Sequence, residues 1–214
     1  EYDSWNWVIE KYGNQITTNN ITNCIHMFAD CTKLTEIPFE LNITSSALGN
    51  GMFDGAEYLT RIANINFASN GVGGGFQSMF ASCYRLKELP LITNFFSKSG
   101  SSIVLDQPFA ACYSLKSIPD FVGDFYKYTS STLKASAYNS LFSNCQNVGE
   151  ITCVPYFPGI MTSNCLGSTF SRCCRAKSIK FKYQDNTIPA AQWKSQTIDL
   201  SNYVGYFASS NTYN

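Results

Sequence analysis

Apolar residues recur along the chain with one repeated spacing. In the first copy Phe28, Cys31, Leu34 and Ile37 follow one another at intervals of three, and Pro38 comes next. Mostly polar or charged residues occupy the positions between them. Comparable copies begin at a phenylalanine every 25 to 37 residues, and a seventh begins close to the last residue. These intervals predict one inward face in each copy.

The residues that carry this pattern are the predicted core of the protein. Small variations occur, such as Ala56 at the cysteine position of the second copy. The predicted core residues are Phe28, Cys31, Leu34, Ile37, Phe53, Leu59, Ile62, Phe80, Cys83, Leu86, Leu89, Phe109, Cys112, Leu115, Ile118, Phe142, Cys145, Val148, Ile151, Phe170, Cys173 and Ile179.

Two elements are predicted for each copy. Residues at i, i+3 and i+6 lie near one face of a short α- or 3₁₀-helical turn, so phenylalanine, cysteine and leucine would point inward together. The following x-x-Ile-Pro segment is either a short strand or a continued helix. Proline cannot continue a helix and biases the residue before it toward extended backbone. We therefore expect short strands at residues 35–37, 87–89 and 116–118.

The recurrence predicts that the copies stack. One copy can bury almost nothing alone, whereas neighbours on both sides supply a continuous core. The shorter intervals lie in the range of roughly 20–29 residues that leucine-rich repeats use. We predict an α/β repeat solenoid in which short parallel strands form a ladder and short helical turns lie on the opposite side. Residues 24–214 would form about seven copies, the last incomplete, and residues 1–23 an N-terminal cap or leader.

The skeleton Phe-x-x-Cys-x-x-Leu-x-x-Ile-Pro resembles the BspA-like leucine-rich repeat of bacterial, protozoan and phage-encoded surface proteins. It is also similar to the Met-Phe-x-x-Cys-x-x-Leu repeats of mycoplasma and Bacteroidetes surface proteins, as in Met27, Phe28, Cys31 and Leu34. The resemblance runs from about residue 24 to the end of the sequence. It implies a leucine-rich-repeat solenoid at a cell or virion surface and a role in adhesion.

The charge and the hydropathy of the chain argue against nucleic-acid binding and against a membrane span. The chain has 15 basic and 15 acidic side chains, so it lacks the basic footprint of a nucleic-acid-binding protein. No run approaches the 18 or more apolar residues that a membrane span needs. We therefore expect neither a nucleic-acid partner nor a membrane span.

The nine cysteines are expected to be mostly structural. Those at the repeat position would be buried thiols that act as small apolar groups. Better candidates for disulfide bridges are Cys24, Cys153, Cys165 and Cys174. The chain has no C-x-x-C motif and a single histidine, His26, so we predict no metal site and no cofactor.

Catalysis is also not expected. A cysteine nucleophile would need His26 within hydrogen-bonding reach as its base. The two nearest cysteines, Cys24 and Cys31, fit structural roles better. Paired carboxylates are available along the chain, but none lies in a recognisable motif. The sequence therefore favours a protein that is not an enzyme.

Aromatic residues gather in the inserts between copies. Insertions in solenoids collect on one face, often the binding face, and exposed tyrosine and tryptophan favour contacts with proteins or sugars. The alternative is that these rings only cover the inserts. The predicted contact residues are Tyr126, Tyr128, Tyr156, Tyr183 and Trp193.

Three functions remain open. The first is a non-catalytic adhesion module, displayed outside the cell or on a virion, that binds host protein or glycan. The alternative is a structural subunit of a virion or filament, such as a decoration protein or fibre, that contacts copies of itself. An intracellular scaffold is a third possibility, favoured only by the unbridged thiols.

Overall fold

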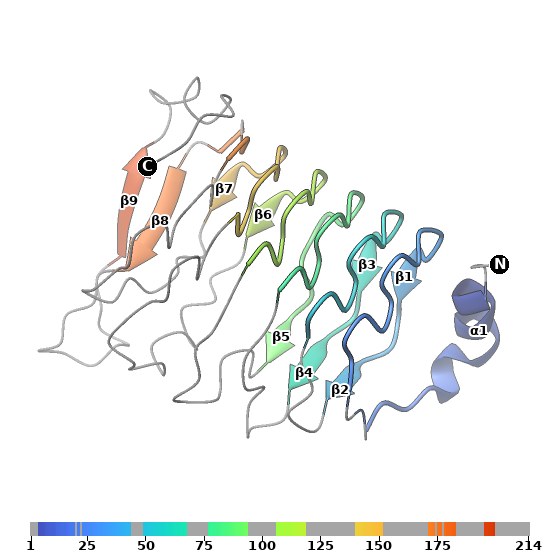
Figure 1. The fold of residues 1–214 in the computed structure, drawn as a ribbon. Coiled ribbons are helices and arrows are strands. Elements are labelled where there is room, and N and C mark those ends of the chain that lie inside the picture. The colour runs from blue at the N-terminus through green and yellow to red at the C-terminus, as the bar shows by residue number, and fades with distance from the viewer. Residues whose placement is uncertain are drawn as a thin grey trace, which may run out of the picture.

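The computed structural model describes residues 4–19, 21, 23–43, 49–67, 77–93, 106–118, 140–151, 171–173, 175, 176, 178–182 and 195–199 (Figure 1). Within them, one α-helix and one 3₁₀ turn precede a series of short strands. The helix is α1 (Ser4–Tyr12), and the 3₁₀ turn is Gly13–Gln15. The strands are β1 (Glu36–Ile37), β2 (Leu41–Ile43), β3 (Arg61–Ile62), β4 (Ile65–Phe67), β5 (Ile92–Thr93), β6 (Ser117–Ile118), β7 (Glu150–Ile151), β8 (Ser178–Lys182) and β9 (Ser195–Asp199).

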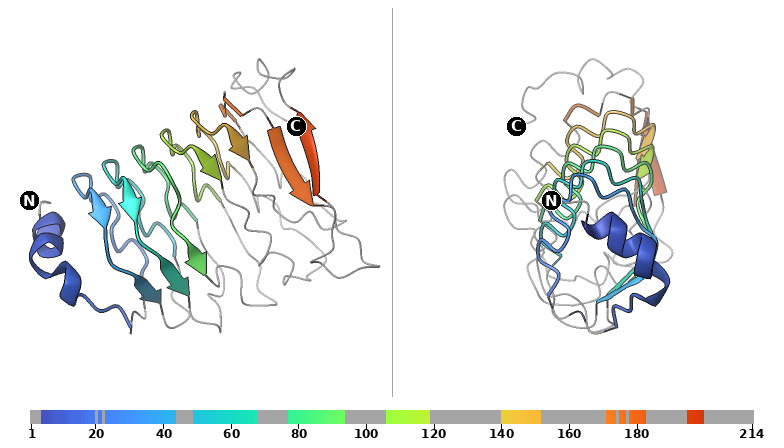
Figure 2. Two further views of the ribbon diagram at one scale, coloured as in Figure 1. Left: turned by 180° about the vertical axis from the view of Figure 1, so that it is seen from behind. Right: turned by 90° about the vertical axis from the view of Figure 1, so that its right-hand side faces the viewer.

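Almost all strand pairs are parallel. Strand β1 pairs with β3, and β2, β4 and β5 form a second ladder. Further along the chain β6, β7 and β8 pair in parallel, and β9 then pairs with β8 in the antiparallel sense. The register joins equivalent positions of successive copies, as in Ile37 with Ile62 and Ile118 with Ile151. Successive copies therefore lie one behind another, with α1 at the N-terminal end (Figure 2).

The segment around each phenylalanine is not helical, contrary to the prediction. Its hydrogen bonds close four-residue turns, such as Met27 N to Cys24 O at 3.3 Å and Cys31 N to Phe28 O at 3.3 Å. The third residue of each such turn has positive φ, as a type II turn requires. Positive φ recurs two residues before and two after the phenylalanine, at His26, Asp30, Gly51, Gly55, Ser78, Ser82, Gln107, Ala111, Ser140 and Asn144.

Stacking explains why turns replace the helix. A helix bonds its N–H groups to its own carbonyls and leaves few donors for a neighbouring copy. In the turn segment, every second backbone N–H group instead donates to a carbonyl oxygen of the next copy. Phe28 N donates to Met52 O at 2.8 Å, and Phe53 N donates to Met79 O at 2.8 Å. The turn segment thus forms a hydrogen-bonded ladder of its own, opposite the strands.

The strands depart from the prediction in two places. Strands β1 and β6 lie within the expected segments, but the structure has no strand at residues 87–89, where the chain bends at Glu88. The ladder of β2, β4 and β5 was not predicted at all. Its signal is the apolar–polar–apolar order of Leu41, Asn42 and Ile43, whose outer two side chains are buried.

Stacked phenylalanine rings run through the interior. The ring centroids of Phe28 and Phe53 lie 5.3 Å apart with 6° between the planes, and each later neighbour repeats this arrangement at 5.3 to 5.6 Å. The cysteine and leucine positions are also buried, while Leu89 is only half-buried. Nothing is described for Phe170, and the side chains of Ile118, Ile151 and Ile179 lie outside the described set.

Helix α1 lies against the first copy. The Trp5 ring meets the edge of the Phe28 ring at 5.0 Å between centroids. Asn6 Nδ2 donates to Lys33 O at 2.6 Å, and Asn6 Oδ1 accepts from Thr35 N at 3.3 Å. In the next copy the equivalent donor, Thr60 N, bonds to Thr35 O. Asn6 Oδ1 therefore takes the position that a backbone carbonyl oxygen of a preceding copy would occupy. No helix in the described part of the chain has the length and apolar character to cross a membrane.

Candidate interaction surface

The aromatic residues predicted as contacts lie outside the described residues. These five residues lie in inserts that the structure does not describe, so a contact role stays a prediction for Tyr126, Tyr128, Tyr156, Tyr183 and Trp193. The described residues nevertheless carry a different exposed aromatic surface, which lies on the repeats themselves.

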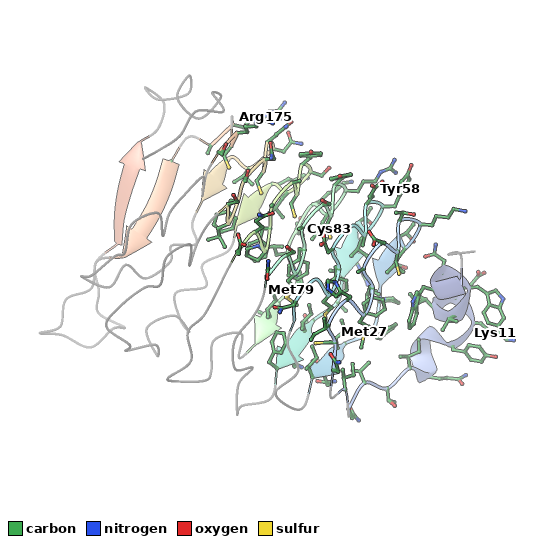
Figure 3. The ribbon with its side chains drawn as sticks, in the orientation of Figure 1. Lys11, Met27, Tyr58, Met79, Cys83 and Arg175 are labelled. Carbon is green, nitrogen blue, oxygen red and sulfur yellow. The ribbon has the colours of Figure 1, made fainter. Side chains whose placement is uncertain are left out.

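This surface is built at the tight corner between the cysteine and leucine positions. A backbone hydrogen bond between residues three apart closes this corner, as from Leu34 N to Cys31 O at 3.0 Å and from Leu86 N to Cys83 O at 3.2 Å. Cysteine and leucine both point inward, so the two residues between them face outward. We call these residues the tip row: Thr32, Lys33, Glu57, Tyr58, Tyr84, Arg85, Tyr113, Ser114, Gln146, Asn147 and Arg175. Figure 3 shows Tyr58 and Arg175 far apart along this same edge of the stack.

Tip-row side chains from neighbouring copies contact one another. The Tyr84 and Tyr113 rings stack at 4.9 Å between centroids, with 12° between their planes. The guanidinium carbon of Arg85 lies 3.8 Å from the centroid of the Tyr58 ring, which is a cation–π contact. Tyr58 and Tyr113 are still 44% and 38% exposed. The contacts therefore order the row without hiding it.

Backbone hydrogen bonds hold the tips in register. Arg85 N donates to Glu57 O at 3.2 Å, and Ser114 N donates to Tyr84 O at 3.1 Å. A ligand would thus meet side chains that are already positioned, and it would lose little free energy in ordering them.

The tip row is basic although the chain as a whole has no net charge. Its described charged residues are Lys33, Arg85 and Arg175 against Glu57, and all three cations are exposed. Exposed Lys87 and Lys116 occupy equivalent positions, each two residues after the second tip residue of its copy and directly after the leucine position. The described part of the tip row therefore carries a net positive charge.

No protein-family model, curated protein or solved structure matches this chain.

A second group of ionisable side chains lies over the turn segment of the first two copies. Gly51 and Gly55 leave the room that His26 and Asp30 occupy, since an added Cβ would come within 2.2 Å of His26 Nδ1 and 2.5 Å of Asp30 Oδ1. Partial burial, followed by the charge of Asp30, raises the pKa of Asp54, while His26 and the Gly55 N–H act in the opposite direction. The described residues contain no group of three or more His, Cys, Asp or Glu that could hold a metal ion.

The buried thiols are poorly suited to chemistry. Burial raises the pKa of Cys24 to about 12, and it raises those of Cys83, Cys112 and Cys145 well above the usual value. A thiol in this state does not supply the thiolate that nucleophilic attack or bridging needs. Cys24, a candidate for a disulfide bridge, is fully buried in the apolar core. Cys153, Cys165 and Cys174 lie outside the described residues.

An open groove runs between α1 and the first copy. Its volume is about 370 Å³, and Asn6, Ile9, Glu10, Glu36 and Pro38 are among the residues that line it. Ligand pockets of this size are usually lined by apolar and aromatic side chains, with a few polar groups for orientation. The groove is mostly polar, and Glu36 is already 3.9 Å from the Arg61 guanidinium. It is a weaker candidate than the tip row.

Proposed function

We propose that this chain is a non-catalytic recognition module that binds protein or glycan at a cell or virion surface through the tip row. The observation that carries the proposal is the contact of exposed side chains across neighbouring repeats, Arg85 on Tyr58 and Tyr84 on Tyr113. Tyrosine and arginine are the residue types that contribute most at binding hot spots. A row of them on a stacked backbone forms an extended, pre-ordered contact surface.

The fold that we propose is a leucine-rich-repeat-like solenoid, as the resemblance to BspA-like surface proteins implies. The parallel register of equivalent residues and the stacked phenylalanines support it. In such an array each repeat contacts only its neighbours, and binding surfaces extend along the stack. The tip row has this extended form.

An extracellular or virion-surface location is compatible with the reduced cysteines. Oxidation requires an accessible thiolate, and burial of Cys83 and Cys112 opposes both access and ionisation. Unbridged thiols therefore give little support to the intracellular scaffold.

The alternative is a structural subunit that assembles with copies of itself. One observation favours it: β9 is the outermost strand of its sheet in the described residues, and such strands pair readily with another chain. At the other end of the stack α1 lies over the first copy, which opposes end-to-end assembly there.

Light scattering on the purified native chain separates the two functions. A monomer at micromolar concentration is the result that we expect for a free-standing recognition module. A defined oligomer or a filament would overturn the proposal in favour of assembly. The matched control is Arg85→Gln, which removes the tip-row cation and should leave the mass of the particle unchanged.

A further inference from the structure

The tip row also indicates what kind of ligand it would bind, and this inference rests on the recognition function proposed above. We propose that the tip row binds a linear polysaccharide that carries carboxylate groups, laid along the stack of repeats. Three features of the described residues lead to this ligand: the charge of the row, its length, and the groups that its side chains leave exposed.

Charge selects an anion. Within the described tips three cations face a single carboxylate, that of Glu57, whereas the whole chain is neutral. Two of these cations are arginines, Arg85 and Arg175, whose planar guanidinium groups bind carboxylates through two parallel hydrogen bonds.

Length selects a polymer. Lys33 belongs to the first copy, Arg85 to the third and Arg175 to the sixth, and the row follows one edge of the stack (Figure 3). Ring contacts between neighbouring tips, at 4.9 Å for Tyr84 and Tyr113, show that the spacing from copy to copy is short and regular. A small molecule would contact one or two tips. An extended chain with a regular charge can contact many.

The exposed groups favour sugars over bases. Proteins that bind single-stranded nucleic acid stack each base on a bare aromatic face. Here Tyr84 and Tyr113 each lose a face to the other, and Arg85 covers a face of Tyr58. The row also carries tyrosine hydroxyls, guanidinium N–H groups and the polar tips Ser114 and Asn147. These groups hydrogen-bond to hydroxyls and carboxylates, which a uronic acid polymer presents along its whole length.

The test is a calorimetric titration of the intact chain with polygalacturonate, a carboxylated linear polysaccharide. We expect binding that weakens as salt is added, and no binding to dextran, which is linear but uncharged. Arg85→Gln should weaken binding on the order of tenfold, the effect of losing a hydrogen bond to a charged group, and Tyr113→Leu should weaken it as well. The matched control is Arg61→Gln, an exposed arginine on the neighbouring strand β3 that is close to Glu36 and outside the tip row.

Each outcome decides the proposal. It is overturned if polygalacturonate does not bind, if Arg61→Gln weakens binding as much as Arg85→Gln, or if a single-stranded oligothymidylate binds more tightly than the polysaccharide. Thermal unfolding of each variant distinguishes lost contacts from lost structure. A chain that is monomeric but does not bind the polysaccharide would overturn this inference and leave the recognition function standing. An oligomer would overturn both.

Discussion

The Cys83 thiol donates a hydrogen bond to the backbone carbonyl oxygen of Phe53, which lies 3.2 Å away in the preceding repeat. Cysteine at this position thus fills a small buried space and also ties two copies together. The bond recurs from Cys112 to Phe80, from Cys145 to Phe109 and from Cys173 to Phe142, at 3.1 to 3.2 Å.

We predict that Cys83→Ala lowers the free energy of unfolding by about 2 kcal/mol, because the substitution removes a buried sulfur and an inter-repeat hydrogen bond. Urea unfolding measures the change. The matched control is Cys31→Ala in the first copy, since no described repeat precedes Cys31 to accept such a bond. Cys31→Ala should cost about 1 kcal/mol less. Equal losses in the two variants would show that the hydrogen bond contributes nothing.

The spacing of the repeat predicted the inward residues but not their backbone. Phe28, Cys31 and Leu34 are buried, as a helical turn would place them. Successive type II turns also bring every third residue inward, so the spacing alone cannot distinguish these turns from a helical turn. The distinguishing signal is local: Gly51 and Gly55 occupy the positions of positive φ in the second copy. Glycine is destabilising inside a helix and favourable at such positions.

The tip row could also have been found in the sequence. Each copy has two residues between the cysteine and leucine positions, and they must face outward once their neighbours point inward. Tyr84 and Tyr113 occupy the same position in successive copies, so their contact follows from stacking. The bonds of Asn6 to Lys33 and Thr35 could not have been predicted, because they join residues almost 30 positions apart through the placement of α1.

We predict that Asn6 stabilises the N-terminal edge of the stack. Asn6→Ala removes the bonds to Lys33 O and Thr35 N and should lower the free energy of unfolding by about 1 kcal/mol. Asn6→Asp keeps the acceptor for Thr35 N but places a carboxylate oxygen against Lys33 O, which also accepts, so it should not restore the lost stability. Thermal unfolding ranks the variants. Glu10→Gln, on the same helix, is the control. An Asn6→Ala variant as stable as the wild type would contradict the proposed role.

Asp54 should make stability depend on pH. Its pKa is raised in the folded chain by partial burial and by Asp30, so the folded state holds the proton more tightly than the unfolded state. Stability therefore falls as pH rises from the ordinary aspartate value of 3.8 through the raised value, and the loss persists above it. We expect Asp54→Asn to remove this decline and to be more stable than the wild type near neutral pH.

Urea unfolding between pH 3 and pH 7 tests the behaviour of Asp54. Asp30→Asn provides a second variant, since loss of the Asp30 charge should bring the pKa of Asp54 closer to its usual value and narrow the range of pH over which stability falls. A decline that is as steep in Asp54→Asn as in the wild type would assign the pH dependence to another group.

The positive φ of the turn segment yields a prediction that can be tested with adjacent residues. Ala111 has φ of 60°, a conformation that costs a residue with a Cβ about 1 kcal/mol and costs glycine almost nothing. Relief of this conformation in Ala111→Gly should raise the free energy of unfolding. The greater chain entropy of the unfolded glycine offsets part or all of this gain, so the variant should be at least as stable as the wild type. Its neighbour Ala110 is not among the residues with positive φ, so Ala110→Gly should lower stability by about 0.5–1 kcal/mol. Chemical denaturation of the two variants compares the same substitution at consecutive positions. If Ala111→Gly were the less stable of the two, the turn segment would not have the alternating backbone that stacks one repeat on the next.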